Sequence, residues 1–378
     1  MLFSSGKAIE LRSVEITAKM RILQICSADY FGGGERYLAD LSNMLVARGH
    51  EVFAAMRPGS PLPGRLAAVP QTSIKYFSMR NAVDLFSAAG ISNFAKEIGA
   101  DLIHAHLARD YTLAAAASTL AGVPYVVTRH VLFPLGRAHR RLLSRVSGVI
   151  APSKAVFDSL VASQIFPDDR IHLIRYAADR KRFASVSKRS NRAFTIGSAA
   201  RLTHNKGHDI LARAARLVLD LRPDVRFIVA GEDPSDLTER REIELLIEDL
   251  GLGGKFELLG KTEDIPQFLS ELDLYVSASR VESFGLSIVE AMMAGVPVIA
   301  TRTDGSAEII DEGVSGVLVP IDDHDSLARV TIQMIDDEVF RQSLSVNGQT
   351  RAINEFSLER MVNETEELYS RVLAERRT

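Results

Sequence analysis

The sequence alternates short apolar runs with stretches of helical periodicity, and it does so twice. The alternation first runs from Arg21 to Ala151, gives way to a polar, basic passage at Arg180–Arg192, and restarts at Phe194. Parallel strands need long crossover connections, and strands buried on both faces read as continuous apolar runs. The pattern therefore predicts an α/β chain with two doubly wound domains. The length of 378 residues agrees, because it exceeds what one core usually supports.

The expected strands are apolar runs bounded by turns. They lie at Arg21–Cys26, Glu51–Met56, Ala100–His106, Tyr125–Thr128 and Gly148–Ala151, and then at Phe194–Ala199, Arg226–Ala230, Lys255–Leu259, Asp273–Ser277, Val296–Thr301 and Gly316–Val319. We assign a first Rossmann-like domain to residues 20–185 and a second to residues 186–354. The segment 355–378 is expected to be a helix that packs back on the first domain, and residues 1–19 are an extension without an assigned role. Ligands bind such sheets at the carboxyl ends of their strands, so a central cleft is expected.

Composition narrows the classes of function. No apolar run is long enough to cross a bilayer, and a formal charge of -3 gives no overall attraction to nucleic acid. Cys26 is the single cysteine, so the chain can form no internal disulfide and no thiolate metal cluster. We therefore expect a cytoplasmic protein without a nucleic-acid partner.

The most informative motif is Glu282-Ser-Phe-Gly-Leu-Ser-Ile-Val-Glu290, which follows an expected strand and runs through a glycine turn into a helix. A helix N-terminus offers unpaired amides and a partial positive charge, so the amides around Phe284, Gly285 and Leu286 could take phosphate oxygens. Glu282 and Glu290 are two helical turns apart and would address different depths of the cleft. The alternative is that these glutamates only cap and solvate an ordinary helix.

A second motif is Arg201-Leu-Thr-His-Asn-Lys206-Gly207, at the end of the first strand of the second domain. An arginine and a lysine five residues apart, on a loop that opens a helix, can neutralise a diphosphate. Such side chains are often merely solvated, but their position at a strand end favours a ligand.

With these residues in view, the chain resembles the retaining glycosyltransferases of family 4, which have the two-domain GT-B architecture. The resemblance rests on Gly32-Gly33-Gly34-Glu35-Arg36, Arg201–Gly207, Gly260–Pro266 and Glu282–Pro297. It implies that Arg201 and Lys206 hold the diphosphate of a nucleotide sugar, that Glu290 bonds the ribose and that Glu282 faces the transferred sugar.

The same resemblance implies further contacts. It places Lys261–Ile265 beside the base and Gly33 and Gly34 near phosphate and acceptor. His130, in Val127-Thr-Arg-His130, resembles the family's histidine that contacts the donor sugar, and we take it as the catalytic residue of the first domain; a histidine that caps a sheet edge is the alternative. His104 and His106 lack a neighbouring carboxylate or cysteine cluster, so we expect structural or cleft-lining roles rather than a metal site.

No cofactor and no metal are expected. No Asp-x-Asp sequence stands at a convincing strand end, and Asp322-Asp-His-Asp325 falls in a late polar turn. Arg201, Lys206 and helix amides would then stabilise the departing diphosphate. The resemblance implies transfer of a hexose-type sugar, from a UDP-sugar as the commonest donor, with retention at the anomeric carbon.

Apolar and basic residues mix at Arg129–Arg145 in the first domain. Arg137, Arg140, Arg141 and Arg145 could bind an anionic membrane surface or an anionic acceptor, or could belong to a solvated helix. Similar passages in the family point to an envelope glycan or lipid-linked acceptor.

The chain also departs from the family. Arg175-Tyr-Ala-Ala-Asp179 stands where Pro-Asn-Gly-Val-Asp is common, and Thr303-Asp-Gly-Ser306 replaces a double-glycine turn. A nucleotide-sugar epimerase or hydrolase and a catalytically silent sugar-nucleotide binding protein therefore stay open. An NAD-dependent oxidoreductase fits less well, because Gly32–Gly34 lacks the spaced glycine fingerprint.

Overall fold

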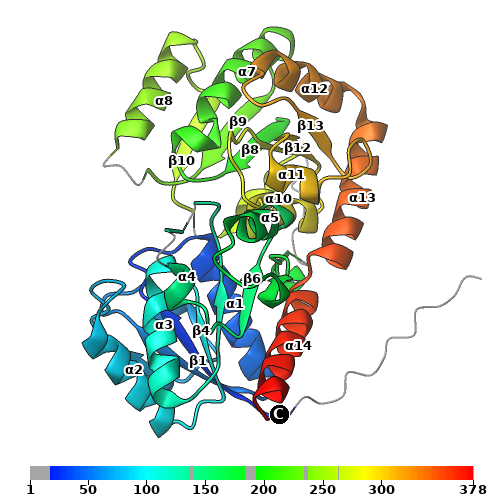
Figure 1. Cartoon of the computed structure of the whole chain (residues 1–378). Coiled ribbons are helices and arrows are strands. Elements are labelled where there is room, and N and C mark those ends of the chain that lie inside the picture. Colours follow the sequence, from blue (N-terminus) through cyan, green and yellow to red (C-terminus); the bar gives the residue numbers. More distant parts are fainter. Residues whose placement is uncertain are drawn as a thin grey trace, which may run out of the picture.

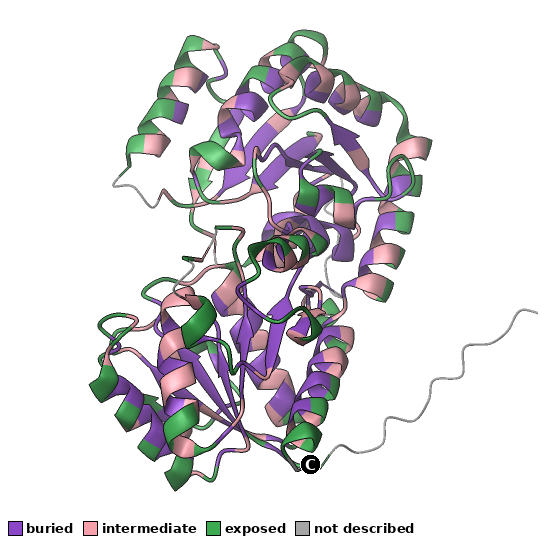
Figure 2. Ribbon diagram, in the orientation of Figure 1, coloured by how far each residue is buried: buried purple, intermediate pink, exposed green. Residues whose placement is uncertain are grey.

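The computed structural model describes residues 18–133, 135–136, 139–183, 193–233, 237–262 and 264–377. They form two α/β domains stacked along the long axis of the molecule (Figure 1). This agrees with the fold class that the alternating pattern predicts. The buried residues lie along the strands and on the inner faces of the helices (Figure 2).

The first domain is built on a seven-stranded parallel sheet with the order β3-β2-β1-β4-β5-β6-β7. Its strands are β1 (Arg21–Cys26), β2 (Glu51–Met56), β3 (Ile74–Tyr76), β4 (Leu102–Ala105), β5 (Tyr125–Thr128), β6 (Gly148–Ala151) and β7 (Ile171–Leu173). Its helices are α1 (Gly33–Ala47), α2 (Leu85–Glu97), α3 (Ala108–Ala121), α4 (His139–Leu142), α5 (Lys154–Ser163) and α6 (Arg180–Phe183), with 3-10 turns η1 (Pro63–Arg65), η2 (Gln71–Ser73) and η3 (Asp168–Arg170).

The second domain has a six-stranded parallel sheet with the order β10-β9-β8-β11-β12-β13. Its strands are β8 (Thr195–Ala199), β9 (Arg226–Ala230), β10 (Phe256–Gly260), β11 (Leu274–Ser277), β12 (Val298–Thr301) and β13 (Val317–Val319). Its helices are α7 (His208–Leu221), α8 (Thr238–Asp249), α9 (Ile265–Ser270), α10 (Leu286–Met293), α11 (Asp304–Ile309), α12 (His324–Asp336) and α13 (Glu338–Glu355), with the 3-10 turn η4 (His204–Lys206).

Both sheets reverse their strand order at one point, between β1 and β4 in the first domain and between β8 and β11 in the second. Loops that leave neighbouring strands in opposite directions open a crevice there, which is where open α/β sheets bind ligands. The loops after β1 and β8 therefore decide where a ligand can sit.

The last helix, α14 (Leu358–Arg377), lies against the first domain, in red beside the blue α1 in Figure 1. Tyr369 on α14 hydrogen-bonds the Nδ1 atom of His104 at 2.6 Å, and Glu366 accepts hydrogen bonds from Arg48 at 2.5 Å and pairs with His50 at 2.9 Å. The chain thus crosses between the domains twice, once after β7 and again between α13 and α14.

Aromatic rings join the two domains. Tyr37 on α1 contacts Tyr176 with ring centroids 5.4 Å apart, Tyr176 contacts Phe284 of the second domain at 5.3 Å, and Phe284 contacts Phe356 at 5.7 Å. All four rings are buried. This continuous apolar contact fixes how the two ligand-binding edges face each other.

The structure differs from the sequence-based expectation at three short elements. The edge strands β3 and β7 have three residues each, too few to show a period. The passage Arg180–Arg192 was predicted to be a linker throughout, but Arg180–Phe183 forms a helical turn and Phe183 is buried. The proposed domain boundary at residues 185 and 186 lies outside the described residues.

Candidate active site

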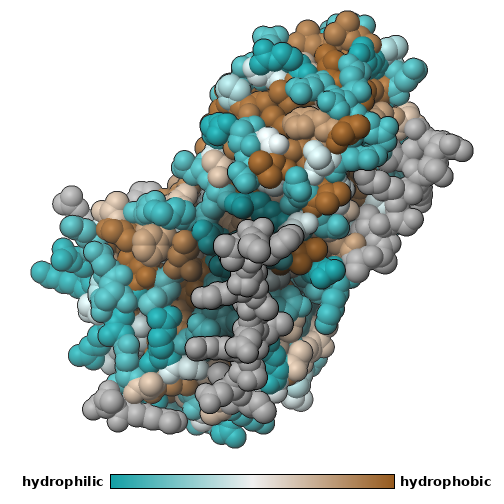
Figure 3. All heavy atoms as spheres, turned by 90° about the vertical axis from the view of Figure 1, so that its right-hand side faces the viewer, coloured by the Kyte–Doolittle hydropathy of each residue, from teal (hydrophilic) through white to brown (hydrophobic). Residues whose placement is uncertain are grey.

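A cavity of about 300 Å³ lies between the domains. The first domain contributes the loop after β1 and three arginines, and the second contributes the strand ends of β8, β9 and β10 and the start of α10. The lining residues are Phe31, Gly32, Gly33, Arg36, Arg65, Arg182, Ala199, Ala200, Arg201, Ala230, Gly231, Glu232, Lys261, Thr262, Ile265, Leu286, Ser287 and Glu290. Hydrophilic side chains mark the hollow where the domains meet on the face shown in Figure 3.

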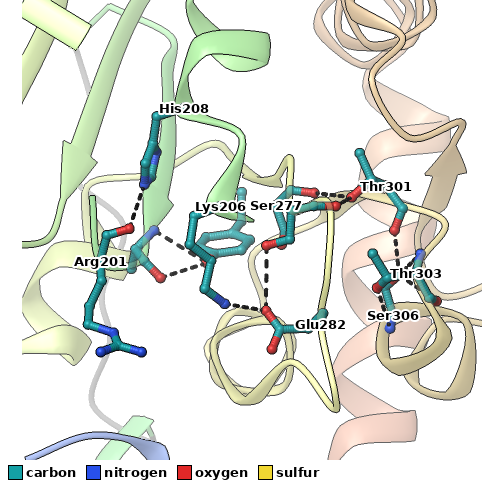
Figure 4. Close-up of polar contacts among 11 residues, drawn as sticks. Arg201, Lys206, His208, Ser277, Glu282, Thr301, Thr303 and Ser306 are labelled. Atoms are coloured by element: carbon teal, nitrogen blue, oxygen red, sulfur yellow. Dashed lines mark hydrogen bonds and ion pairs between the residues drawn. The ribbon is translucent and has the colours of Figure 1, made fainter. Parts of the chain in front are cut away.

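Lys206 and Glu282 form an ion pair beside this cavity. The Lys206 Nζ atom lies 2.5 Å from Glu282 Oε2, and the Ser279 hydroxyl lies 3.5 Å from the same oxygen (Figure 4). Lys206 follows β8 and Glu282 follows β11, so the pair spans the reversal point of the second sheet. Both side chains are largely buried, which strengthens the attraction because little water screens it.

The loop that carries Glu282 is fixed by hydroxyl groups. Thr301, at the end of β12, donates to the Ser279 carbonyl at 2.5 Å, and Ser306 donates to the Thr301 carbonyl. Thr303 caps α11 by accepting from the Ser306 amide at 3.2 Å. These contacts tie the ends of β11 and β12 together (Figure 4). The turn at Thr303 that departs from the family pattern thus keeps the motif loop in place.

Arg280 is a residue that the sequence analysis missed. Its guanidinium bonds both carboxylate oxygens of Asp209, at 2.9 and 2.7 Å, as well as Asp322 at 2.7 Å and the His204 carbonyl at 2.7 Å. It thereby clamps the Lys206 loop to the Glu282 loop. An arginine two residues before a motif glutamate gives no signal of its own, because its partners are distant in sequence.

Two glycines allow the loops of the second domain to approach closely. Gly207 has φ +64°, and a Cβ there would lie 2.0 Å from the Ala278 carbonyl oxygen. A Cβ on Gly231, which lines the cavity, would lie 1.8 Å from the Ala200 carbonyl oxygen. A larger residue would push either loop away from the strand ends.

Arg201 extends away from the Lys206–Glu282 pair toward the first domain (Figure 4). Its guanidinium carbon lies 5.8 Å from the centroid of the Tyr30 ring, and its carbonyl accepts a hydrogen bond from His208 at 3.0 Å. Within the described ranges Arg201 forms no ion pair. A cation so held at a cavity wall is available to an anionic ligand.

Glu290 points from α10 toward arginines of the first domain. Arg36 donates to its Oε1 atom, and Arg182 lies 3.8 Å from the same oxygen. Asp40 is close by, and burial raises its pKa to about 6 against the pull of Arg182 and Arg36. Glu290 is 5% exposed. A ribose hydroxyl at Glu290 would share the carboxylate with these arginines.

His130 belongs to a chain of hydrogen bonds under the cleft. Its Nδ1 atom bonds the Tyr176 hydroxyl, and its Nε2 atom lies 3.4 Å from Nδ1 of His106. Burial, with the Arg129 charge beside it, lowers the pKa of His130 to about 3, so the ring is neutral at pH 7. His106 continues the chain, with its Nε2 atom 2.8 Å from Gln24 Oε1.

His104 and His106 lie in the core. His104 is 0% exposed, with its Nε2 atom 2.7 Å from the Thr128 hydroxyl, and His106 is 2% exposed. Burial lowers the pKa of both rings, that of His104 to about 3. Among the described residues, no group of three or more His, Cys, Asp or Glu side chains is arranged to hold a metal ion.

The structure brings only part of the proposed site to the cavity wall. Gly33, Arg201, Leu286 and Glu290 line the cavity, as do Lys261, Thr262 and Ile265 of the segment proposed to border the base. The remaining proposed residues lie outside its lining; they are Gly34, His130, Lys206, Glu282, Phe284 and Gly285. A Cβ on Gly34 would lie 3.0 Å from the His130 ring.

Phe284 has a packing role that the motif did not reveal. It is 1% exposed, and its ring lies between Tyr176 and Phe356. Gly285 begins α10 with φ +109°, a conformation that favours glycine. Leu286 and Ser287, the first two residues of that helix, line the cavity, and the first amides of a helix have no partner within it.

Two family models match the chain. The model described as glycosyl transferases group 1 matches residues 179–351, and the model described as glycosyltransferase family 4 matches residues 31–182. Together they span both domains, and they meet where the chain first crosses between them.

Several characterised proteins are similar over nearly the whole length. N-acetyl-alpha-D-glucosaminyl L-malate synthase of Bacillus anthracis is 24% identical over 90% of this chain and 94% of its own. The lipopolysaccharide core biosynthesis glycosyltransferase LpsE of Rhizobium meliloti is 26% identical, with coverages of 87% and 93%. The crystal structure of Anabaena Alr3699/HepE in complex with UDP and glucose superposes with a TM-score of 0.80 at 25% identity, covering 92% of this chain and 98% of that one.

The strand order of both sheets, the cleft between their reversal points, the two family models and these relatives agree. The chain belongs to the family 4 glycosyltransferases with the GT-B fold.

Proposed function

We propose that the protein transfers a hexose-type sugar from a nucleotide sugar, a UDP-sugar, to an envelope glycan or a lipid-linked acceptor, with retention at the anomeric carbon. The observation that carries the proposal is the cavity between the two reversal points, with Arg201 at one wall and the start of α10 at another. Support for UDP comes from the similar structure with bound UDP and glucose, and support for the acceptor from the lipopolysaccharide relative.

The residues present can assist departure of a nucleoside diphosphate. Arg201, Leu286 and Ser287 line the cavity, the last two in the first turn of α10, and Lys206 follows on the same loop as Arg201. As the bond between the anomeric carbon and the phosphate oxygen breaks, its electron pair passes to that oxygen. An acceptor hydroxyl then bonds the anomeric carbon on the same face and gives its proton to the departing phosphate. Fixed donors lower the barrier because they need no reorganisation as charge develops.

We also propose contact with an anionic membrane surface through the first domain. Arg140, Arg141 and Arg145 are exposed around α4, and Phe133 and Leu142 are 76% and 54% exposed. Arg137, the fourth proposed arginine, lies outside the described residues. Among the helices that the structure describes, none combines the length and apolar character needed to cross a membrane. Cosedimentation with anionic liposomes at low salt tests the contact, and absence of binding would contradict it.

The experiment for the reaction is a donor screen by nucleoside diphosphate release. UDP-, GDP- and ADP-sugars are tested with and without a crude envelope glycan extract, each with and without chelator. Acceptor-dependent release from a UDP-sugar that survives the chelator supports the proposal, and the anomeric configuration of the product tests retention. Release without acceptor would favour a hydrolase or epimerase, and tight binding without release a silent binding protein.

A further inference from the structure

Two consecutive aromatic residues, of which Phe31 lines the cavity, each lie beside an arginine. Tyr30 and Phe31 follow β1 and precede α1. The Arg201 guanidinium lies 5.8 Å from the Tyr30 ring centroid, and the Arg65 guanidinium lies 5.2 Å from the Phe31 ring centroid. Arg201 belongs to the second domain and Arg65, at the end of η1, to the first. The pair of rings therefore holds one cation from each side of the cleft.

Most charges around the cavity are matched within the protein. Lys261 lies 4.0 Å from Glu232, and Lys206 is paired with Glu282. The Arg36 and Arg182 side chains share the carboxylate of Glu290, and Asp40 lies beside them. The two positive charges of this group are therefore matched by two carboxyl groups. These contacts leave no strong local excess of positive or negative charge.

Arg65 and Arg201 are different. Neither forms an ion pair with any residue in the described part of the chain, although both line the cavity. Contact with an aromatic ring holds a guanidinium in place without cancelling its charge and leaves its N–H donors free. Glu35 interacts electrostatically with Arg201 without forming an ion pair. Its carboxylate instead accepts a hydrogen bond from the Gly32 amide at 2.9 Å and caps the N-terminus of α1. Among the described residues that line the cavity, two arginines thus have no ion pair.

We infer that Arg65 is a donor-binding residue, which contacts the diphosphate of the nucleotide sugar from the first domain while Arg201 contacts it from the second. This rests on the proposed function, because it takes the cavity to be the nucleotide-sugar site. The diphosphate of a nucleotide sugar carries two negative charges, which matches the two uncommitted arginines. Guanidinium groups suit this ligand because they form paired hydrogen bonds with phosphate oxygens.

A diphosphate held by Arg65 and Arg201 contacts both domains, so donor binding favours the arrangement in which the two arginines face the same cavity. After transfer the nucleoside diphosphate still bears its charges, so the same two arginines also hold the product. Replacing Arg65 is therefore expected to lower the affinity for both the donor and the product and to leave the binding of the base unchanged.

The test uses calorimetric binding of UDP and of uridine to the full-length protein. Arg65→Ala is expected to weaken UDP binding about tenfold or more, the usual cost of losing a hydrogen bond between charged groups, and to change uridine binding less than about twofold. Arg65→Lys, which keeps the charge, should recover part of the loss. Arg371→Ala, on the exposed side of α14, is the matched control and should leave both affinities unchanged.

Other outcomes separate the inference from the proposed function. Equal weakening of UDP and uridine by Arg65→Ala would show that Arg65 stacks on the base, and unchanged UDP binding would show that it touches no part of the ligand; either overturns the inference. Arg201→Ala serves as the reference for the site. If Arg201→Ala also leaves UDP binding intact, or if the parent protein binds no UDP, the proposed donor is wrong. If UDP binding is lost in Arg201→Ala but not in Arg65→Ala, only the role of Arg65 is refuted.

Discussion

The two edges that face the cleft are built from different chemistry. In the second domain, charged side chains are held in ion pairs, with Lys206 on Glu282 and Arg280 on Asp209, and glycines let the loops lie against backbone. In the first domain, Arg36, Arg65 and Arg182 reach the cavity, but beneath it neutral rings form a buried chain from Tyr176 through His130 to His106. Charges suit a diphosphate, and uncharged hydrogen-bonding groups suit sugar hydroxyls. Under the proposed function, the leaving group is therefore expected at the edge of the second domain.

The largest expected effect tests the charged edge. Lys206→Ala should reduce sugar transfer by about 10²–10³-fold, the usual loss when one well-placed donor to a developing negative charge is removed. The fold should survive, because Lys206 is partly exposed and is not in the core. Nucleoside diphosphate release and thermal unfolding measure the two effects. Lys255→Ala, on an exposed turn, is the control, and full turnover in Lys206→Ala would remove this edge from catalysis.

A second prediction tests how tightly the charged loops are built. Gly207→Ala should lower the free energy of unfolding by about 3 kcal/mol or more, because it adds a clash with the Ala278 carbonyl to the strain of a left-handed residue. Gly313→Ala is the matched control, since Gly313 has φ +70° but nothing within 4 Å of its added Cβ. That variant should cost only about 1–2 kcal/mol. If denaturant titrations gave the same loss of unfolding free energy for Gly207→Ala and Gly313→Ala, the clash with the Ala278 carbonyl would contribute nothing to the destabilisation.

A buried histidine next to this chain of rings, His104, should make stability sensitive to acid. The pKa of His104 is lowered to about 3 by burial, against about 6.5 in the unfolded chain. Between these values the unfolded state binds the extra proton, so this contribution to stability is present above pH 6.5 and is lost as the pH falls toward 3. His104→Asn should flatten the fall of stability below pH 6.5 by up to about 1.4 kcal/mol per pH unit.

The measurement for this prediction is a series of denaturant titrations from pH 7 to pH 4.5. His324→Asn is the control, because His324 is exposed on α12, and it should keep the slope of the parent protein. An unchanged slope in His104→Asn would show that the ring takes up its proton within the folded state.

The smallest expected effect concerns Tyr176. Tyr176→Phe keeps the ring contacts with Tyr37 and Phe284 but removes the hydroxyl that bonds His130. We expect a loss of about 1 kcal/mol in stability and a turnover reduced by only a few fold, since His130 loses one of two partners. Thermal unfolding and initial rates measure both. A loss as large as that in Lys206→Ala would mean that the neutral edge contributes to the chemistry as strongly as the charged one.

Local pattern was sufficient for most of the fold. β1, β2, β5, β6 and β9 begin and end at the predicted residues, because each is an apolar run between clear turn signals. The edge strands β3 and β7 were missed, because three residues cannot show a period. The motifs directed attention to Arg201 and Glu290, which do line the cavity, but the helix N-terminus argument also named Phe284, whose ring belongs to the contact between the domains.

Local patterns in the sequence were enough to predict the two α/β domains, the loops with charged motifs and the family. The pairing of charges depends on the tertiary structure: Arg36 meets Glu290 across 254 residues of chain, and Arg65 lies beside Phe31 with no carboxylate partner among the described residues. Periodicity reports how a segment partitions between core and water, whereas an ion pair depends on which distant loop is packed opposite, and that is set by the arrangement of the two sheets.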